Sequence, residues 1–121
     1  MARILVIDDD PDVVDACRLV LEGAGHEATG AHSVDEGMAA IDKLKPDLLI
    51  LDVMMDQPDD GIKMAQELRG RSLDLPIIMM TSVGKACGMA FGKDDEMVPV
   101  NVFLEKPVEP AALVAKVNEL L

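Results

Sequence analysis

Short apolar runs alternate along this chain with segments of helical period, and no other feature of the sequence restricts the fold as strongly. Such alternation is typical of repeated strand-and-helix units, which assemble into a parallel sheet covered by helices. The runs are apolar at nearly every position, as expected for strands that are buried on both faces. The strands predicted in this way are Arg3 to Ile7, Leu48 to Leu51, Ile77 to Thr81 and Val102 to Leu104.

Residues 27–31 are predicted to form a fifth strand, although their apolar signal is weak. They lie between two segments of helical period, so an edge strand fits their position. Residues 84–100 hold three glycines and a proline, which favours a short or irregular helix there. The other helices are predicted at Pro11 to Glu22, from a capping box at Ser33 to Leu44, at Ile62 to Arg69 and at Pro110 to Leu121.

The composition indicates one acidic domain over residues 1–121. Its 23 acidic and 11 basic residues give a formal net charge of −12, which opposes binding to nucleic acid or to an anionic membrane. The two cysteines, Cys17 and Cys87, are too few for a disulfide framework, and the amino terminus has no signal-peptide pattern. We therefore expect a cytoplasmic protein whose partners are cations or basic groups.

Reactive residues are concentrated where the predicted strands end. In an open parallel sheet, ligands bind outside the carboxyl ends of the strands. Four strands of this chain lead into polar or charged residues, so these residues should converge. The strand-end residues are Asp8, Asp9 and Asp10, then Asp52, then Thr81 and Ser82, and last Glu105, Lys106 and Pro107.

Carboxylates that are held close together repel one another, so a site of this kind either retains a proton or binds a cation. Oxygen ligands without histidine or cysteine favour Mg²⁺, which keeps several waters and leaves positions for phosphate oxygens. Lys106 and the hydroxyl of Thr81 suit phosphoryl oxygens. An aspartate that faces the metal can itself be the nucleophile of a phosphoryl transfer. Asp10 is different, because it precedes Pro11 at a helix start and N-capping explains it.

Four ordered motifs extend over essentially the whole chain. They are Ile4 to Pro11, Asp47 to Met55, Pro76 to Ser82 and Phe103 to Pro107. In these motifs and their order, the chain resembles the receiver domain of bacterial two-component response regulators. The resemblance implies an α/β fold of the flavodoxin-like (CheY-like) type, a doubly wound parallel sheet of five strands in the order 2-1-3-4-5.

The resemblance also implies that Asp52 is the phosphoacceptor of a magnesium site. Asp9 is expected to bind Mg²⁺ more directly, and Asp8 is expected to act largely through water. The backbone carbonyl of Met54 is expected to supply a further ligand to the metal.

Other residues are implied to bind the phosphoryl group and to respond to it. Thr81 and Lys106 are expected to contact the phosphoryl oxygens, and Pro107 is expected to follow as a cis-proline. Phe103 lies at the position of an aromatic switch, which moves inward when the counterpart of Thr81 moves toward the phosphate. Phosphorylation would thereby shift the population between two conformations.

The chain departs from the usual receiver pattern in two segments. Receivers usually place Pro four residues and Gly eight residues after the phosphoacceptor, whereas this chain has Asp56 at the first position and Gly61 one residue later than the second. The segment from Thr81 to Phe103 is also longer than is typical. The first departure bears on partner docking or metal affinity, and the second bears on signalling.

The leading hypothesis is a stand-alone receiver that accepts a phosphoryl group on Asp52 from a sensor histidine kinase or a phosphotransfer protein. Because the sequence ends at Leu121, we expect output through contact with an unidentified protein or through a phosphorelay, although a shortened form of a longer protein would look the same. A monomer or weak dimer is expected. No enzymatic activity is expected beyond the protein's own phosphorylation and dephosphorylation.

Two alternatives remain open. A Mg²⁺-dependent phosphatase that uses Asp52 for turnover generally needs a second carboxylate two residues later, where this chain has Met54. An interaction module that ignores phosphorylation is expected to have lost an acidic, threonine or lysine position of the site, and none is lost here.

Overall fold

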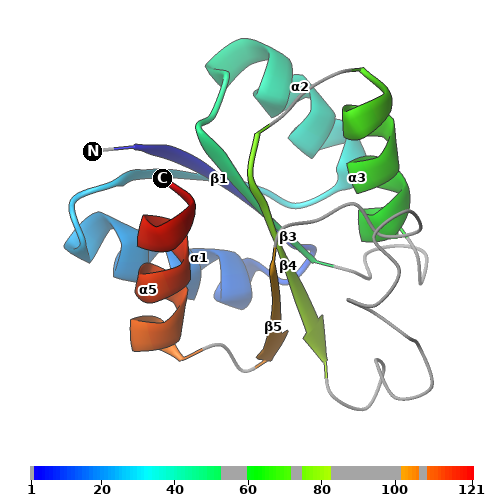
Figure 1. The fold of residues 1–121 in the computed structure, drawn as a ribbon. Helices are drawn as coiled ribbons and strands as arrows, with labels where there is room; N and C mark the ends of the chain where they lie inside the picture. Colours follow the sequence, from blue (N-terminus) through cyan, green and yellow to red (C-terminus); the bar gives the residue numbers. More distant parts are fainter. Residues whose placement is uncertain (1, 53–59, 72–74, 83–101, 107–108) are drawn as a thin grey trace.

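A computed structural model of the protein describes residues 2–52, 60–71, 75–82, 102–106 and 109–121. Within these ranges the chain forms five strands and four helices (Figure 1). The strands are β1 (Arg3–Ile7), β2 (Glu27–Ala31), β3 (Leu48–Asp52), β4 (Ile77–Ser82) and β5 (Val102–Lys106). The helices are α1 (Pro11–Gly23), α2 (Val34–Leu44), α3 (Asp60–Gly70) and α5 (Pro110–Leu120).

The strands form one parallel sheet in the order β2-β1-β3-β4-β5. This order confirms the predicted flavodoxin-like fold, with β2 at one edge of the sheet as expected. Three strands continue one or two residues beyond their predicted ends, to Asp52, Ser82 and Lys106, because parallel pairing continues there. The irregular fourth helix predicted for residues 84–100 lies outside the described part of the chain.

Side chains of the central strands alternate between two cores, one on each face of the sheet. In β1, Leu5 and Ile7 join the core beneath α2 and α3, while Ile4 and Val6 join the core beneath α1 and α5. Figure 1 shows α2 and α3 on one side of the sheet and α1 and α5 on the other. Burial on both faces explains why the predicted strands are apolar at nearly every position. It also fixes the register, since a slip by one residue would exchange every side chain between the two cores.

Helix α1 begins at a side-chain N-cap, and a glycine with a left-handed backbone conformation lies shortly after its end. Asp10 is the N-cap, and its side chain accepts a hydrogen bond from the N–H of Asp12 at 2.9 Å, which confirms its predicted capping role. Gly25, just after the helix, has a φ of 93°, in the left-handed region that favours glycine. The buried residues on the inner face of the helix are Val14, Cys17 and Leu21.

Helix α2 begins at the predicted N-cap, but its capping contacts differ from a simple capping box. The side-chain oxygen of Ser33 accepts a hydrogen bond from the N–H of Glu36 at 3.1 Å, as predicted. The carboxylate of Glu36 accepts its bond from the N–H of His32, one residue before the N-cap, at 3.2 Å. The helix ends at Leu44, and Lys45 follows with a φ of 49°.

Helix α1 approaches β2 closely at Gly30. A Cβ atom added to Gly30 would overlap Cγ1 of Val14, which is buried against the same face of the sheet. Because Val14 is branched at Cβ and sits in a helix, its side chain has one strongly preferred rotamer and little freedom to move aside. Glycine at position 30 is therefore required for the close packing of α1.

The substitution Gly30→Ala should lower the free energy of unfolding by about 1–3 kcal/mol through overpacking, measured by urea titration. The matched control is Gly23→Ala at the end of α1, where an added Cβ meets no atom within 4 Å. This control should leave stability unchanged or raise it by up to about 1 kcal/mol. Equal effects of the two substitutions would contradict the close approach at Gly30.

Candidate functional site

The pairing of β1 with β3 brings two aspartates to the same edge of the sheet. Ile7 pairs with Leu51 in parallel register, and the next residue on each strand is an aspartate, Asp8 and Asp52. Since β3 lies between β1 and β4 in the sheet, its carboxyl end has neighbours on both sides. Asp52 therefore occupies the middle of the edge where the predicted site residues should meet.

Three of the predicted acidic residues form a cluster at this edge. Asp8, Asp9 and Asp52 each offer a carboxylate oxygen, and these oxygens all lie within 4.8 Å of one another. Asp8 is 0% exposed and Asp52 is 5% exposed, whereas Asp9 is exposed to solvent. The strand-end pattern thus predicted correctly that these side chains meet, and their chemical roles stay predictions.

Two backbone groups hold Asp8 in place. Its own N–H donates a hydrogen bond to the carbonyl oxygen of Ala31, at the end of β2, at 3.1 Å. The N–H of Asp10 donates to Oδ1 of Asp8 at 3.0 Å. The sequence prediction missed this second contact. A signal for it was present, because aspartate side chains often bond to the backbone two residues later.

The donor set of the cluster fits a small, hard cation. It consists of carboxylate oxygens alone, with no histidine or cysteine in the group. Mg²⁺ typically binds one or two protein carboxylates and keeps several waters, which suits a cluster whose third member, Asp9, is open to solvent. A divalent cation would also offset the repulsion among the carboxylates. The residues present therefore fit the magnesium that the sequence predicts.

The strands β4 and β5 bring two more predicted site residues to the same edge. Asp52 pairs with Met80 of β4, and Thr81 is the next residue along that strand. Lys106 ends β5, where it pairs with Ser82. The backbone register therefore places Thr81 and Lys106 at the carboxyl ends of the two strands that follow β3 in the sheet.

The other predicted residues are placed less completely. The backbone of Phe103 pairs with Met79 in β4, three residues before the end of β5. Met54 and Pro107 lie outside the described residues, as does Asp56 in the segment after Asp52. The metal-binding role of Met54, the cis peptide bond of Pro107 and the effect of Asp56 on partner docking or metal affinity stay predictions.

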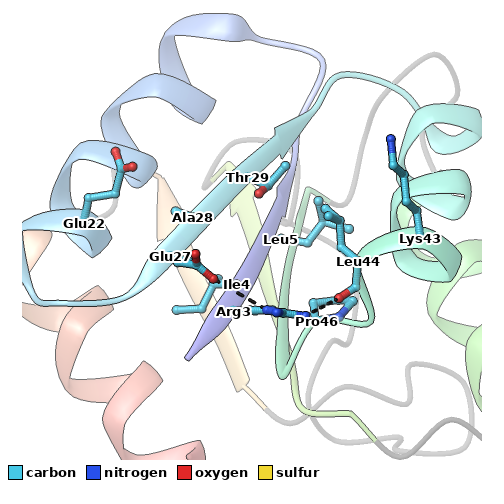
Figure 2. A pocket seen from close by; sticks show the side chains of 10 residues that line it. All are labelled: Arg3, Ile4, Leu5, Glu22, Glu27, Ala28, Thr29, Lys43, Leu44 and Pro46. Carbon is cyan, nitrogen blue, oxygen red and sulfur yellow. Dashed lines mark hydrogen bonds and ion pairs between the residues drawn. The ribbon is translucent and has the colours of Figure 1, made fainter. Parts of the chain in front are cut away.

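A separate surface hollow of about 400 Å³ lies at the amino-terminal edge of the sheet (Figure 2). It is lined in part by Arg3 and Glu27, which begin β1 and β2, by Leu44, which ends α2, and by Pro46 between α2 and β3. The Arg3 guanidinium donates to the carbonyl oxygen of Leu44 at 3.4 Å and pairs with Glu27 at 3.6 Å. This hollow lies at the opposite ends of the strands from the acidic cluster, so it adds nothing to that site.

Comparison with known proteins decides the family. The family model described as "Response regulator receiver domain" matches residues 4–118, nearly the whole chain. The chain belongs to the response regulator receiver domain family. The predicted resemblance to two-component receivers is thereby confirmed.

Curated relatives of this receiver domain are longer proteins. The DNA-binding dual master transcriptional regulator RpaA of Synechocystis is 37% identical over 127 residues, covering 100% of this chain and 49% of RpaA. The alkaline phosphatase synthesis transcriptional regulatory protein PhoP of Bacillus subtilis is 32% identical over 123 residues, covering 98% of this chain and 48% of PhoP. The chain thus spans about half the length of these curated relatives.

Solved structures of similar length share the receiver fold. A putative response regulator from Chloroflexus aurantiacus superposes with a TM-score of 0.85 at 36% identity, covering 98% of this chain and 96% of that one. The chemotaxis protein CheY4 of Vibrio cholerae superposes with a TM-score of 0.82 at 27% identity, covering 100% and 99% of the two chains. Among the helices described in this receiver domain, none is long and apolar enough to cross a membrane.

Asp9→Asn should weaken Mg²⁺ binding by roughly 10-fold or more, because it removes a charged oxygen ligand from the cluster. Isothermal titration calorimetry measures the affinity directly. The control is Asp15→Asn, which removes the same charge from an exposed position on α1 and should change the affinity by less than about threefold at physiological ionic strength. If both variants lost affinity equally, general charge and not the cluster would account for metal binding.

Proposed function

We propose that this receiver domain accepts a phosphoryl group on Asp52 in a Mg²⁺-dependent reaction. The observation that carries the proposal is the position of Asp52 at the end of the central strand β3. On one side lie the carboxylates of Asp8 and Asp9, which fit a cation. On the other side lies the carboxyl end of β4, which carries Thr81. Asp52 is therefore the aspartate that lies between the acidic pair and the carboxyl end of β4.

The proposed reaction forms a bond between a carboxylate oxygen of Asp52 and the phosphorus of the donor. The bond from phosphorus to the donor's leaving atom breaks, and that atom leaves with the bonding electron pair. When bound, Mg²⁺ supplies charge neutralisation for the phosphoryl oxygens. Lys106 contributes a second positive charge, and the hydroxyl of Thr81 donates a hydrogen bond to a phosphoryl oxygen.

The donor is proposed to be a phosphohistidine of a sensor histidine kinase or of a phosphotransfer protein. In that case the nitrogen–phosphorus bond breaks with its electron pair going to nitrogen, and the imidazole leaves as a neutral group when its other ring nitrogen carries a proton. Membership of the receiver family supports this source. Beyond transfer onto Asp52 and its later hydrolysis, we propose no enzymatic turnover.

Output is proposed to occur through phosphorylation-dependent protein contact or through a phosphorelay. The formal net charge of −12 supports protein contact over direct contact of this domain with nucleic acid or an anionic membrane. Thr81 and Phe103 are proposed to couple the phosphate to the partner surface by a shift between two conformations. A monomer or weak dimer in the cytoplasm is proposed as the working form.

Incubation with a small acyl phosphate and Mg²⁺ should add the mass of one phosphoryl group to the protein, detected by intact mass spectrometry. The Asp52→Asn variant should show no added mass, because an amide oxygen is a poor nucleophile for phosphorus. Asp35→Asn is the control, since Asp35 is exposed in the first turn of α2 and lies outside the cluster. It should be phosphorylated like wild type.

Assays of phosphate release and of partner binding on the same proteins distinguish the two alternatives. Release of phosphate over many turnovers, lost in Asp52→Asn, would indicate a phosphatase, although Met54 stands where such an enzyme generally needs a carboxylate. If folded wild-type protein gained no mass, the proposal that Asp52 accepts a phosphoryl group would be refuted. Partner binding that is the same in wild type and Asp52→Asn would indicate an interaction module that ignores phosphorylation.

A further inference from the structure

The three consecutive aspartates after β1 do not share one role. Asp8 and Asp9 belong to the cluster with Asp52. Asp10 is exposed and is not a member of that cluster. Its place between the candidate metal site and α1 suggests a separate role, in which it acts on the site through another residue.

Asp10 is fixed to the first turn of α1 by both its side chain and its backbone. Its Oδ1 accepts a hydrogen bond from the N–H of Asp12 at 2.9 Å. Its carbonyl oxygen accepts bonds from the N–H groups of Val13 at 3.1 Å and Val14 at 3.2 Å. The backbone nitrogen of Asp10 is therefore held in place relative to the helix.

That same N–H donates to Oδ1 of Asp8 at 3.0 Å. Fixing one oxygen fixes the rotation of the carboxylate, and thus the direction in which its second oxygen points. Asp8 is 0% exposed, so solvent cannot replace this contact cheaply if it is lost. The helix is itself held against the sheet, because Val14 is buried beside Gly30. A continuous set of contacts thus connects the core, α1, Asp10 and the cluster.

We propose that Asp10 is a positioning residue for the metal site, which acts by capping α1 and thereby directing its backbone N–H to Asp8. The inference rests on the proposed function, since it requires that the cluster binds Mg²⁺. Positioning competes with two simpler roles for an acidic residue at this place. In the first, the charge of Asp10 attracts the cation directly. In the second, its cap stabilises the fold with no effect on the site.

Four substitutions at position 10 distinguish these three roles. Asp10→Asn and Asp10→Ser remove the charge but keep a side-chain oxygen that caps a helix nearly as well as aspartate. Asp10→Ala removes both the charge and the cap. Asp10→Gly also removes the side-chain acceptor but costs the helix less, so it serves if the alanine variant does not fold.

The Mg²⁺ dissociation constant of each variant should be measured by calorimetry at an ionic strength of about 1 M, where a Debye length of about 3 Å screens most of the effect of the exposed charge on Asp10. Asp10→Ala and Asp10→Gly should bind roughly 10-fold more weakly, as is typical when a group that orients a metal ligand is lost. Asp10→Asn and Asp10→Ser should stay within about threefold of wild type, because their caps keep the N–H of Asp10 in place. Equal losses in all four variants would refute positioning in favour of charge, and wild-type affinity in Asp10→Ala would refute any role at the site.

Ser33→Ala is the matched control for stability. Ser33 caps α2 through the N–H of Glu36, as Asp10 caps α1. Urea titrations in the presence of a chelator should show that Ser33→Ala and Asp10→Ala lose comparable stability, whereas only Asp10→Ala loses Mg²⁺ affinity. If Ser33→Ala weakened Mg²⁺ binding as much as Asp10→Ala does, general destabilisation would explain the effect and the positioning role would be refuted. A wild-type protein that binds no Mg²⁺ would instead refute the proposed function itself.

Discussion

The parallel pairing of β1 with β3 is the constraint on which the site depends. It holds Asp8 and Asp52 next to each other although their charges repel. At the separations of this cluster, such repulsion amounts to roughly 1–4 kcal/mol per pair for effective dielectric constants between that of water and about 20. The burial of aliphatic side chains acts in the opposite direction, and the two strands bury eight of them: Ile4, Leu5, Val6, Ile7, Leu48, Leu49, Ile50 and Leu51. Burial therefore prevails, and the sheet presents a site whose charge favours a cation.

The two cores make different contributions to this site. The core beneath α2 and α3 takes every second side chain of β1 and β3, which fixes the register that aligns the aspartates. The core beneath α1 and α5 takes the others and also holds the start of α1, from which the N–H of Asp10 reaches Asp8. Strand β2 adds a third support, since the carbonyl oxygen of Ala31 accepts from the N–H of Asp8. The geometry of the cluster thus depends on packing in the two cores as much as on the aspartates themselves.

The strands and helix starts that depend on local sequence pattern could be predicted from the sequence. Continuous apolar runs located the strands β1, β3, β4 and β5 within two residues, and the dipeptide Asp10-Pro11 located the start of α1. Contacts between distant segments were not predictable in the same way. His26 is half-buried, with Nδ1 accepting from the N–H of Ala2 at 3.2 Å and Nε2 lying 3.3 Å from Oδ1 of Asn118. Its partners are 24 and 92 residues away in the chain, and no local pattern indicates them. The contact of Asp10 with Asp8 is local, yet a run of three aspartates is equally typical of a metal site, a helix cap or both.

The central claim is that the sheet register assembles a candidate cation site beside Asp52, the proposed phosphoacceptor. Anomalous diffraction from crystals of the protein grown with Mn²⁺, which prefers the same oxygen ligands as Mg²⁺, tests this claim most directly. A strong anomalous peak is expected within bonding distance of carboxylate oxygens of both Asp9 and Asp52. A fully ordered cluster with no peak, while Mn²⁺ is bound elsewhere on the protein, would contradict it.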